Sequence, residues 1–138
     1  MIHYVENPDV TVEDILPLYE AVGWTNYTTK PEMLKAAFEN SLHVLAAFNE
    51  EGILVGVLRA VGDGASILFI QDILVTPEYQ HQGIGTKLLQ QTLEKYKNVY
   101  QIQLTTDNSM KTISFYESNG FTSLISLNCV SFMYTGNQ

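Results

Sequence analysis

Two glycines, Gly83 and Gly85, stand where an apolar run gives way to a helical pattern. The apolar run, residues 69–75, predicts a buried strand that ends at Thr76-Pro77, and a helix is predicted to begin at the glycines. A glycine loop between a strand and a helix N-terminus leaves several backbone N–H groups unpaired and directed at one point, an arrangement that binds phosphate. We therefore expect a phosphate-bearing ligand on this loop, whose residues are Gln80, His81, Gln82, Gly83, Ile84, Gly85 and Thr86.

Two common phosphate-binding motifs do not fit the loop. A P-loop requires Gly-x-x-x-x-Gly-Lys-Ser/Thr, which the run from Gly83 to Lys87 does not supply. A dinucleotide fingerprint requires a third glycine, but Leu88 stands at that position. The ligand therefore belongs to another class of phosphate compound.

Two stretches of the chain point to one family. The first is Gln80-x-x-Gly83-x-Gly85, preceded by the strand and by Pro-Glu-Tyr, and the second is Phe-Tyr-Glu-Ser-Asn-Gly-Phe at residues 115–121. In this order they resemble the coenzyme A loop and the Phe-Tyr-Glu signature of the GCN5-related N-acetyltransferase (GNAT) superfamily. The resemblance is best over residues 44–121 and implies acetyl-CoA as the co-substrate.

The resemblance also implies roles for individual residues. It places Ile73, Leu74 and Val75 on the pantetheine arm of coenzyme A, which can pair with a strand edge, and the loop 80–86 on the pyrophosphate. Tyr116 is implied as the general acid, because a phenol that is neutral at pH 7 can protonate a departing thiolate. Asn108 stands one position before the place of the family's cofactor-contacting asparagine, so it either contacts the cofactor or caps a helix.

The loop departs from the family at one position. The family often has arginine where this chain has the neutral Gln80, and Lys87 is the nearby base. We therefore expect backbone amides, more than side-chain charge, to hold the pyrophosphate.

Asp72 is the candidate general base. It lies in an apolar strand pattern, where an unpaired carboxylate is costly, so it needs either a catalytic role or a structural hydrogen-bond partner. Glu78 is a weaker candidate because a loop leaves it solvated. The acceptor pocket is expected to use Trp24 and Tyr27, an aromatic pair that suits an amine, although a core position for Trp24 is an equal alternative.

The elements that must position these residues form one α+β domain over residues 1–138. The patterns predict a mixed, mostly antiparallel sheet with helices on both faces, the GNAT fold by resemblance. We expect strands at 2–5, 42–48, 53–61, 66–75 and 99–105, final strands within 121–134, and helices at 12–22, from 30–31, at 83–97 and from 108–109. The resemblance implies that the fourth and fifth strands splay apart.

Composition and charge narrow the classes of partner, cofactor and location that the sequence allows. The net charge of −8 argues against nucleic acid, and ten of the 15 acids lie in residues 1–65, which favours a cationic acceptor. No apolar run is long enough for a membrane, no metal-ligand cluster is visible, and the N-terminus has no secretory pattern, so we expect a cytoplasmic protein without a metal. The single Cys129, in the predicted C-terminal strand, is expected to be buried.

The predicted function is acetyl transfer from acetyl-CoA to a small-molecule primary amine, by direct attack in a ternary complex. Two alternatives stay open: acetylation of a protein N-terminus or lysine, and a non-catalytic acyl-CoA sensor. Family members often dimerise, so the resemblance also allows a homodimer.

Overall fold

The computed structural model describes residues 1–136, which divide into two compact units, one spanning residues 1–105 and the other beginning at Thr106. The first unit holds one five-stranded sheet with the strands in chain order. Its strands are β1 (His3–Glu6), β2 (His43–Phe48), β3 (Leu54–Gly62), β4 (Ile67–Val75) and β5 (Gln101–Leu104). The first three pairs are antiparallel and β4 with β5 is parallel, so the predicted mixed, mostly antiparallel sheet is confirmed.

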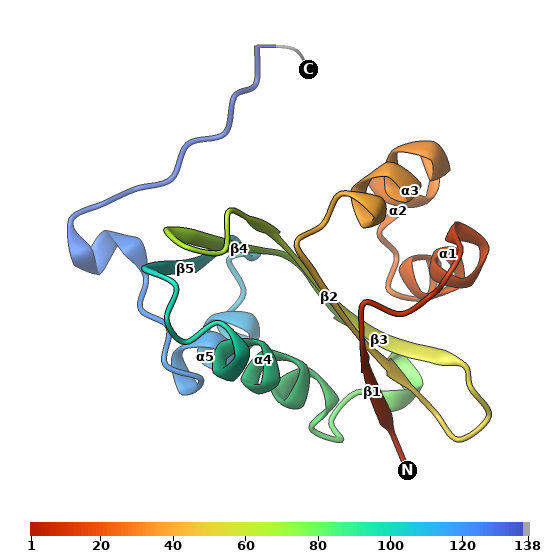
Figure 1. The fold of residues 1–138 in the computed structure, drawn as a ribbon. Coiled ribbons are helices and arrows are strands. Elements are labelled where there is room, and N and C mark those ends of the chain that lie inside the picture. Colours follow the sequence, from red (N-terminus) through yellow and green to blue (C-terminus); the bar gives the residue numbers. More distant parts are fainter. Residues whose placement is uncertain (137–138) are drawn as a thin grey trace. The chain divides into compact units, whose positions relative to one another are not determined.

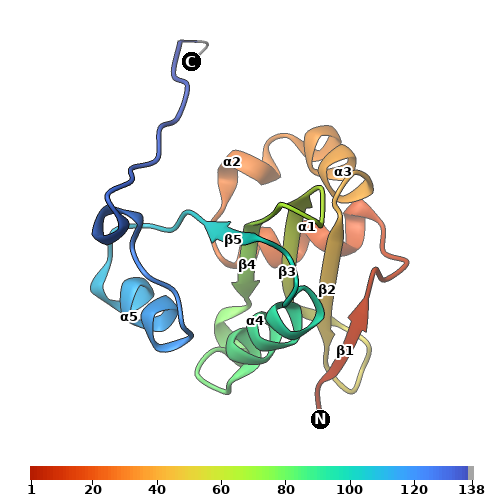
Figure 2. The ribbon, with the colours of Figure 1, turned by 60° about the vertical axis from the view of Figure 1, so that its left-hand side comes forward.

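Helices cover both faces of this sheet (Figures 1 and 2). One face carries α1 (Val12–Ala21), the short α2 (Thr25–Thr28) and α3 (Pro31–Glu39), and the other carries α4 (Ile84–Lys95). Thr11 is the N-cap of α1 and forms a reciprocal capping box with Asp14. The left-handed Gly23 follows the C-terminal end of the helix. The helix α2 was not predicted, because four residues carry too little periodicity to be read from sequence.

The core on the α1 face consists of apolar side chains from α1, α3 and three strands. Its buried members are Ile15, Leu18, Tyr19, Leu34, Val44, Ala46, Val57 and Leu74. Partly buried aromatics pack around it, and Trp24, Tyr27 and Phe38 are among them. Trp24 therefore packs against the core and is also partly exposed, so its position agrees in part with each of the two alternatives expected for it.

The second unit holds α5 (Met110–Ser118) and the 3₁₀ turn η2 (Leu124–Leu127). Ser109 is the N-cap of α5 and its hydroxyl accepts the Thr112 N–H, so the alternative that Asn108 caps this helix is wrong. The prediction of final strands within 121–134 is also wrong: the described part of that segment contains η2 and extended chain without a ladder. Cys129 is exposed rather than buried, because the strand expected to bury it is absent.

Candidate functional site

The glycine loop lies between β4 and α4, as predicted, with a short 3₁₀ turn, η1 (Pro77–Tyr79), in between. Gly83 is the N-cap of α4 with φ of 84°, and no side chain caps the helix. A Cβ built on Gly83 meets nothing within 4 Å, so the space in front of it is open. Among residues 1–136 no acceptor bonds the backbone N–H groups at the start of the helix, which belong to Gly83, Ile84, Gly85 and Thr86.

Contacts from neighbouring elements hold the loop in place. The Tyr79 hydroxyl accepts a hydrogen bond from Asn49 Nδ2 at 3.1 Å, which ties η1 to the β2–β3 turn. Gln80 Nε2 donates to the Val75 carbonyl at 2.9 Å, so this side chain secures the end of β4. The ammonium of Lys87 lies 5.4 Å from the centroid of the Tyr4 ring on β1. Neither Gln80 nor Lys87 therefore points its polar group freely into the loop.

The edge of β4 is open beside this loop. The parallel pairing with β5 covers only Ile67–Ile70, so residues 71–75 have no strand on that side in the described chain. Thr76 N–H bonds Val55 of β3 at 2.9 Å, and alternate residues of a strand face opposite neighbours, so the backbone groups of Ile73 and Val75 face the open side. Leu74 faces β3 and its side chain is buried in the core.

A β-bulge interrupts β4 at the point where β5 ends. Ala60 of β3 pairs with Ile70 and Arg59 pairs with Asp72, so Gln71 has no partner across the ladder. A bulge re-aims the side chains that follow it. Here it turns Asp72 and Leu74 toward the α1 face of the sheet.

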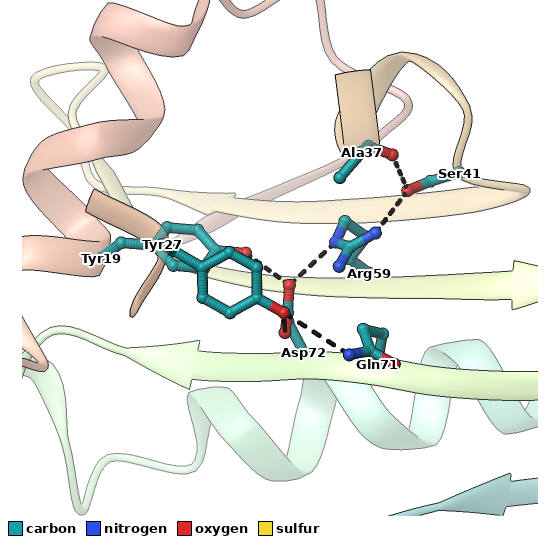
Figure 3. Close-up of polar contacts among 7 residues, drawn as sticks. All are labelled: Tyr19, Tyr27, Ala37, Ser41, Arg59, Gln71 and Asp72. Carbon is teal, nitrogen blue, oxygen red and sulfur yellow. Dashed lines mark hydrogen bonds and ion pairs between the residues drawn. The ribbon is translucent and has the colours of Figure 1, made fainter. Parts of the chain in front are cut away.

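Asp72 lies at the centre of a buried polar network (Figure 3). Its side chain is 2% exposed, and Arg59 Nε donates to its Oδ2 at 2.8 Å. Tyr19 donates its hydroxyl to the same oxygen at 2.9 Å, and Tyr27 donates to Oδ1 at 2.9 Å. The carboxylate is thus held by one cation and two phenols.

Burial and the neighbouring Asp72 carboxylate both raise the pKa of the two phenols. Burial, followed by the charge of Asp72, raises the pKa of Tyr19 far above its usual value. Burial also raises the pKa of Tyr27, so both keep their protons at neutral pH. Arg59 completes the network by donating from Nη1 to Ser41 Oγ at 3.3 Å.

Tyr19 and Tyr27 differ in their exposure and in their other contacts. Tyr19 is fully buried, whereas Tyr27 is partly exposed and its ring stacks on Trp24 with centroids 6.1 Å apart. Gln71 Nε2 lies 3.5 Å from the Tyr27 hydroxyl, so this hydroxyl stands beside the bulge and the open edge of β4. The structure therefore links Asp72, Tyr27 and Trp24 in one cluster.

Arg59 and Tyr19 were missed by the sequence reasoning. One signal was present: Arg59 and Asp72 are the charged members of two otherwise apolar runs joined by a hairpin, which suggests that they pair across it. Tyr19 gave no such signal, because its place in the helical apolar pattern predicts only a core residue.

Tyr116 lies on α5 in the second unit. Its ring is half-buried and makes edge contacts with Phe115 and Phe121, at centroid distances of 5.0 and 5.8 Å. Burial, and next the charge of Asp107, raises the pKa of Tyr116 to about 12. Its phenol is therefore protonated at neutral pH, as a proton donor must be. Asn108 is exposed in the turn before the helix.

Comparison with known proteins decides the family. Residues 39–123, more than half of the chain, match the family model described as an acetyltransferase (GNAT) domain. The chain belongs to the GNAT acetyltransferase family. The family predicted from the glycine loop and the Phe-Tyr-Glu stretch is therefore confirmed.

Individual relatives agree with this assignment. A solved GNAT-family acetyltransferase from Streptococcus pneumoniae TIGR4 is 40% identical, with a TM-score of 0.90 and complete coverage of both chains. An uncharacterized N-acetyltransferase, ycf52, of Gracilaria tenuistipitata var. liui is 30% identical over 83% of this chain and 64% of its own length. A protein of Glycine max named histone acetyltransferase TAP1 is 32% identical over 82% of this chain and 52% of its own. The chain thus spans between half and two-thirds of these two relatives.

Neither a metal-ligand cluster nor a membrane-spanning helix occurs in residues 1–136. In residues 1–136, histidine, cysteine and acidic side chains do not gather in groups of three that suit a metal ion. Within the same range, no helix combines the length and the apolar character that a membrane crossing requires.

Proposed function

We propose that this enzyme transfers the acetyl group of acetyl-CoA to the primary amine of a small molecule by direct attack in a ternary complex. The observation that supports it is the combination at the end of β4. Among residues 1–136, four N–H groups at the start of α4 have no acceptor, and the neighbouring edge of β4 has no strand beside it. A pyrophosphate fits the first feature and an amide-bearing arm fits the second.

The residues present fit coenzyme A. The loop 80–86 would hold the pyrophosphate through backbone N–H groups, with Gly83 leaving room for a close approach. Ile73 and Val75 would pair with the pantetheine amides, while Leu74 would support the strand from the core. When bound, acetyl-CoA supplies an activated acetyl thioester. The neutral Gln80 tethers the loop to β4 rather than adding a charge to it.

Tyr27 is the residue through which we propose that Asp72 acts on the amine. Asp72 accepts three hydrogen bonds and is nearly inaccessible, so direct contact with a substrate would require breaking one of those bonds. The Tyr27 proton is committed to Asp72, and Gln71 Nε2 donates to the Tyr27 oxygen at a long 3.5 Å, which leaves one lone pair of that oxygen to accept an amine N–H. Trp24, stacked on Tyr27, would add an aromatic wall that attracts a cation.

Tyr116 is proposed as the general acid, and Asn108 as a further contact of the cofactor. The support for Tyr116 is its place in the family signature and the raised pKa that keeps its phenol protonated. Asn108 is supported by its exposure and by its not capping α5.

Acetylation of a protein lysine or N-terminus is the second candidate. The soybean relative carries the name of a histone acetyltransferase, and the ten acids of residues 1–65 suit a cationic peptide as well as a cationic small molecule.

A panel of amines tests the proposal. Release of free thiol from acetyl-CoA would be followed with spermidine, amino acids, kanamycin and a lysine-containing peptide. The proposal expects turnover with a small amine at least tenfold above the peptide in kcat/KM. Preference for the peptide favours the second candidate, and acetyl-CoA binding without release of thiol by any acceptor would indicate a sensor.

A further inference from the structure

Arg59 is the single arginine of the chain, and it lies buried on β3 beside Asp72 (Figure 3). Its Nε donates to Asp72 at 2.8 Å and its Nη1 to Ser41 Oγ at 3.3 Å, and its Cζ lies 5.8 Å from the centroid of the Phe38 ring. A buried ion pair is often no more stabilising than apolar side chains of similar volume, whereas removing one partner leaves a costly unpaired charge. The place of this pair next to Tyr27 therefore points to a role beyond stability.

Three side chains face the Asp72 carboxylate, and each comes from a different element. Arg59 reaches it from β3, Tyr19 from α1 and Tyr27 from α2, and within residues 1–136 no lysine, histidine or second acid pairs with it. Burial lowers the pKa of Arg59, but the charge and the hydrogen bond of Asp72 raise it by more, so the guanidinium stays charged. A buried acid without such a cation takes up a proton, so the charge on Asp72 depends on Arg59.

The direction of the Tyr27 hydroxyl follows from the charge on Asp72. A carboxylate has acceptors only, so both phenols must donate to it, and a lone pair of the Tyr27 oxygen is left for the open side. A protonated carboxyl would carry its hydrogen on Oδ1 and donate it to the Tyr27 oxygen, which turns the Tyr27 hydrogen outward. Tyr19 cannot reverse in the same way, because its hydroxyl is buried and donates to no other acceptor in residues 1–136.

We propose that Arg59 is a positioning residue for acetyl transfer: by keeping Asp72 ionised, it keeps the Tyr27 oxygen an acceptor for the amine. This role rests on the proposed function, in which Tyr27 accepts an N–H of the substrate. An outward Tyr27 O–H would instead donate to the nitrogen lone pair, which is the electron pair that must attack the thioester. Loss of the Arg59 charge is thus expected to slow the reaction of the amine without changing the affinity for acetyl-CoA.

Two substitutions separate the charge of Arg59 from its contribution to packing. Arg59→Met removes the charge and keeps an unbranched side chain, whereas Arg59→Lys keeps the charge and loses the forked guanidinium. Val57→Ala is the matched control, because Val57 is 1% exposed, lies two residues away on the same face of β3 and carries no charge. Thiol release would give kcat/KM for the amine across about pH 6 to 9, divided at each pH by that of the unchanged chain to cancel the titration of the amine itself.

The expected losses differ in their dependence on pH. Near neutral pH, Arg59→Met should lower kcat/KM at least about tenfold, and the loss should shrink as the pH rises and the carboxyl gives up its proton. Arg59→Lys should stay within about fivefold of the unchanged chain at every pH. The ratio for Val57→Ala should not change with pH.

Asp72 itself gives a readout that does not depend on acetyl transfer. The chain has five aspartates, so isotope labelling of their carboxyl carbons gives a carbon NMR spectrum with few signals, and Asp72→Asn identifies the signal of Asp72. We expect this signal to show proton uptake between about pH 9 and 6 in Arg59→Met, and an ionised carboxylate throughout in the unchanged chain and in Arg59→Lys.

Three results would overturn the proposal. The first is a loss of kcat/KM in Arg59→Met that is the same at every pH, which is what a purely structural role produces. The second is an Asp72 signal that titrates in this range in the unchanged chain, a measurement that decides the matter even if Arg59→Met does not fold. The third is an Arg59→Lys variant that keeps Asp72 ionised and yet loses as much activity as Arg59→Met. Failure of the proposed function is recognised separately: the unchanged chain would then release no thiol with any amine of the panel, whatever the NMR signal shows, and the positioning role would fall with it.

Discussion

Tyr27→Phe tests whether Tyr27 contacts the substrate or only supports Asp72. Tyr19→Phe is its matched control, because Tyr19 bonds the same carboxylate. Tyr19 and Tyr27 both donate to Asp72 at 2.9 Å, but Tyr19 is fully buried and only Tyr27 reaches the open side of the sheet. Each substitution removes one hydroxyl and leaves the ring. The two variants therefore disturb the same carboxylate at its two different oxygens.

The expected magnitudes differ between stability and catalysis. A hydrogen bond to a buried charge contributes about 1.5–3 kcal/mol, so Tyr19→Phe should lower the free energy of unfolding by about 2 kcal/mol. Tyr27→Phe should cost about 1 kcal/mol or less, since water can replace part of its bond. In catalysis the order reverses: losing the acceptor of the amine N–H should lower kcat/KM roughly 10- to 100-fold in Tyr27→Phe, and less than about twofold in Tyr19→Phe.

Urea unfolding and steady-state thiol release, with the best amine of the panel, measure the two quantities. Calorimetric titration with acetyl-CoA should give the same affinity for both variants and the unchanged chain. The reasoning is refuted if Tyr27→Phe keeps full kcat/KM, or if both variants lose activity only in proportion to their stability.

Three other perturbations have defined outcomes. Asp72→Asn should lower kcat/KM for the amine at least about tenfold if Asp72 acts on the amine through Tyr27, and an unchanged kcat/KM would assign that role to water or another residue. Tyr116→Phe should lower turnover much more than acetyl-CoA affinity, and full turnover would remove its acid role. His43 is 1% exposed, and burial lowers its pKa from 6.5 to about 4, so the unfolded chain binds the extra proton first as pH falls. Stability should therefore decline between pH 6.5 and 4 by up to about 3 kcal/mol, and His43→Leu should abolish that part of the decline in urea titrations.

The sequence predicted the sheet and the main helices because their patterns are strong. The apolar run of β4 and the glycines after it place strand, loop and helix within one or two residues of the structure. The sequence identified Asp72 as a candidate site residue because a charge in an apolar strand requires a partner or a role. The structure shows that three hydrogen-bond donors surround its carboxylate. That result did not follow from sequence, since it depends on a bulge at Gln71 and on residues from three separate elements.

The C-terminal segment shows where pattern reasoning fails. Its alternation predicts a strand, but a strand requires a neighbour as well as a sequence. Residues 129–135 are extended and carry the right side chains, yet form no ladder in the described chain. Cys129 was expected to be buried for the same reason, and its exposure follows from the missing partner.

Calorimetric titration of acetyl-CoA into the unchanged chain and into Gly83→Val tests the central claim most directly. A valine at φ of 84° is strained and projects into the open space in front of the N–H groups of α4. A Gly23→Val variant, changed at a glycine of similar φ with equally open surroundings, controls for backbone strain. We predict that binding is lost, or weakened at least 100-fold, in Gly83→Val alone. Equal affinity in all three proteins would contradict the assignment of this loop to the pyrophosphate.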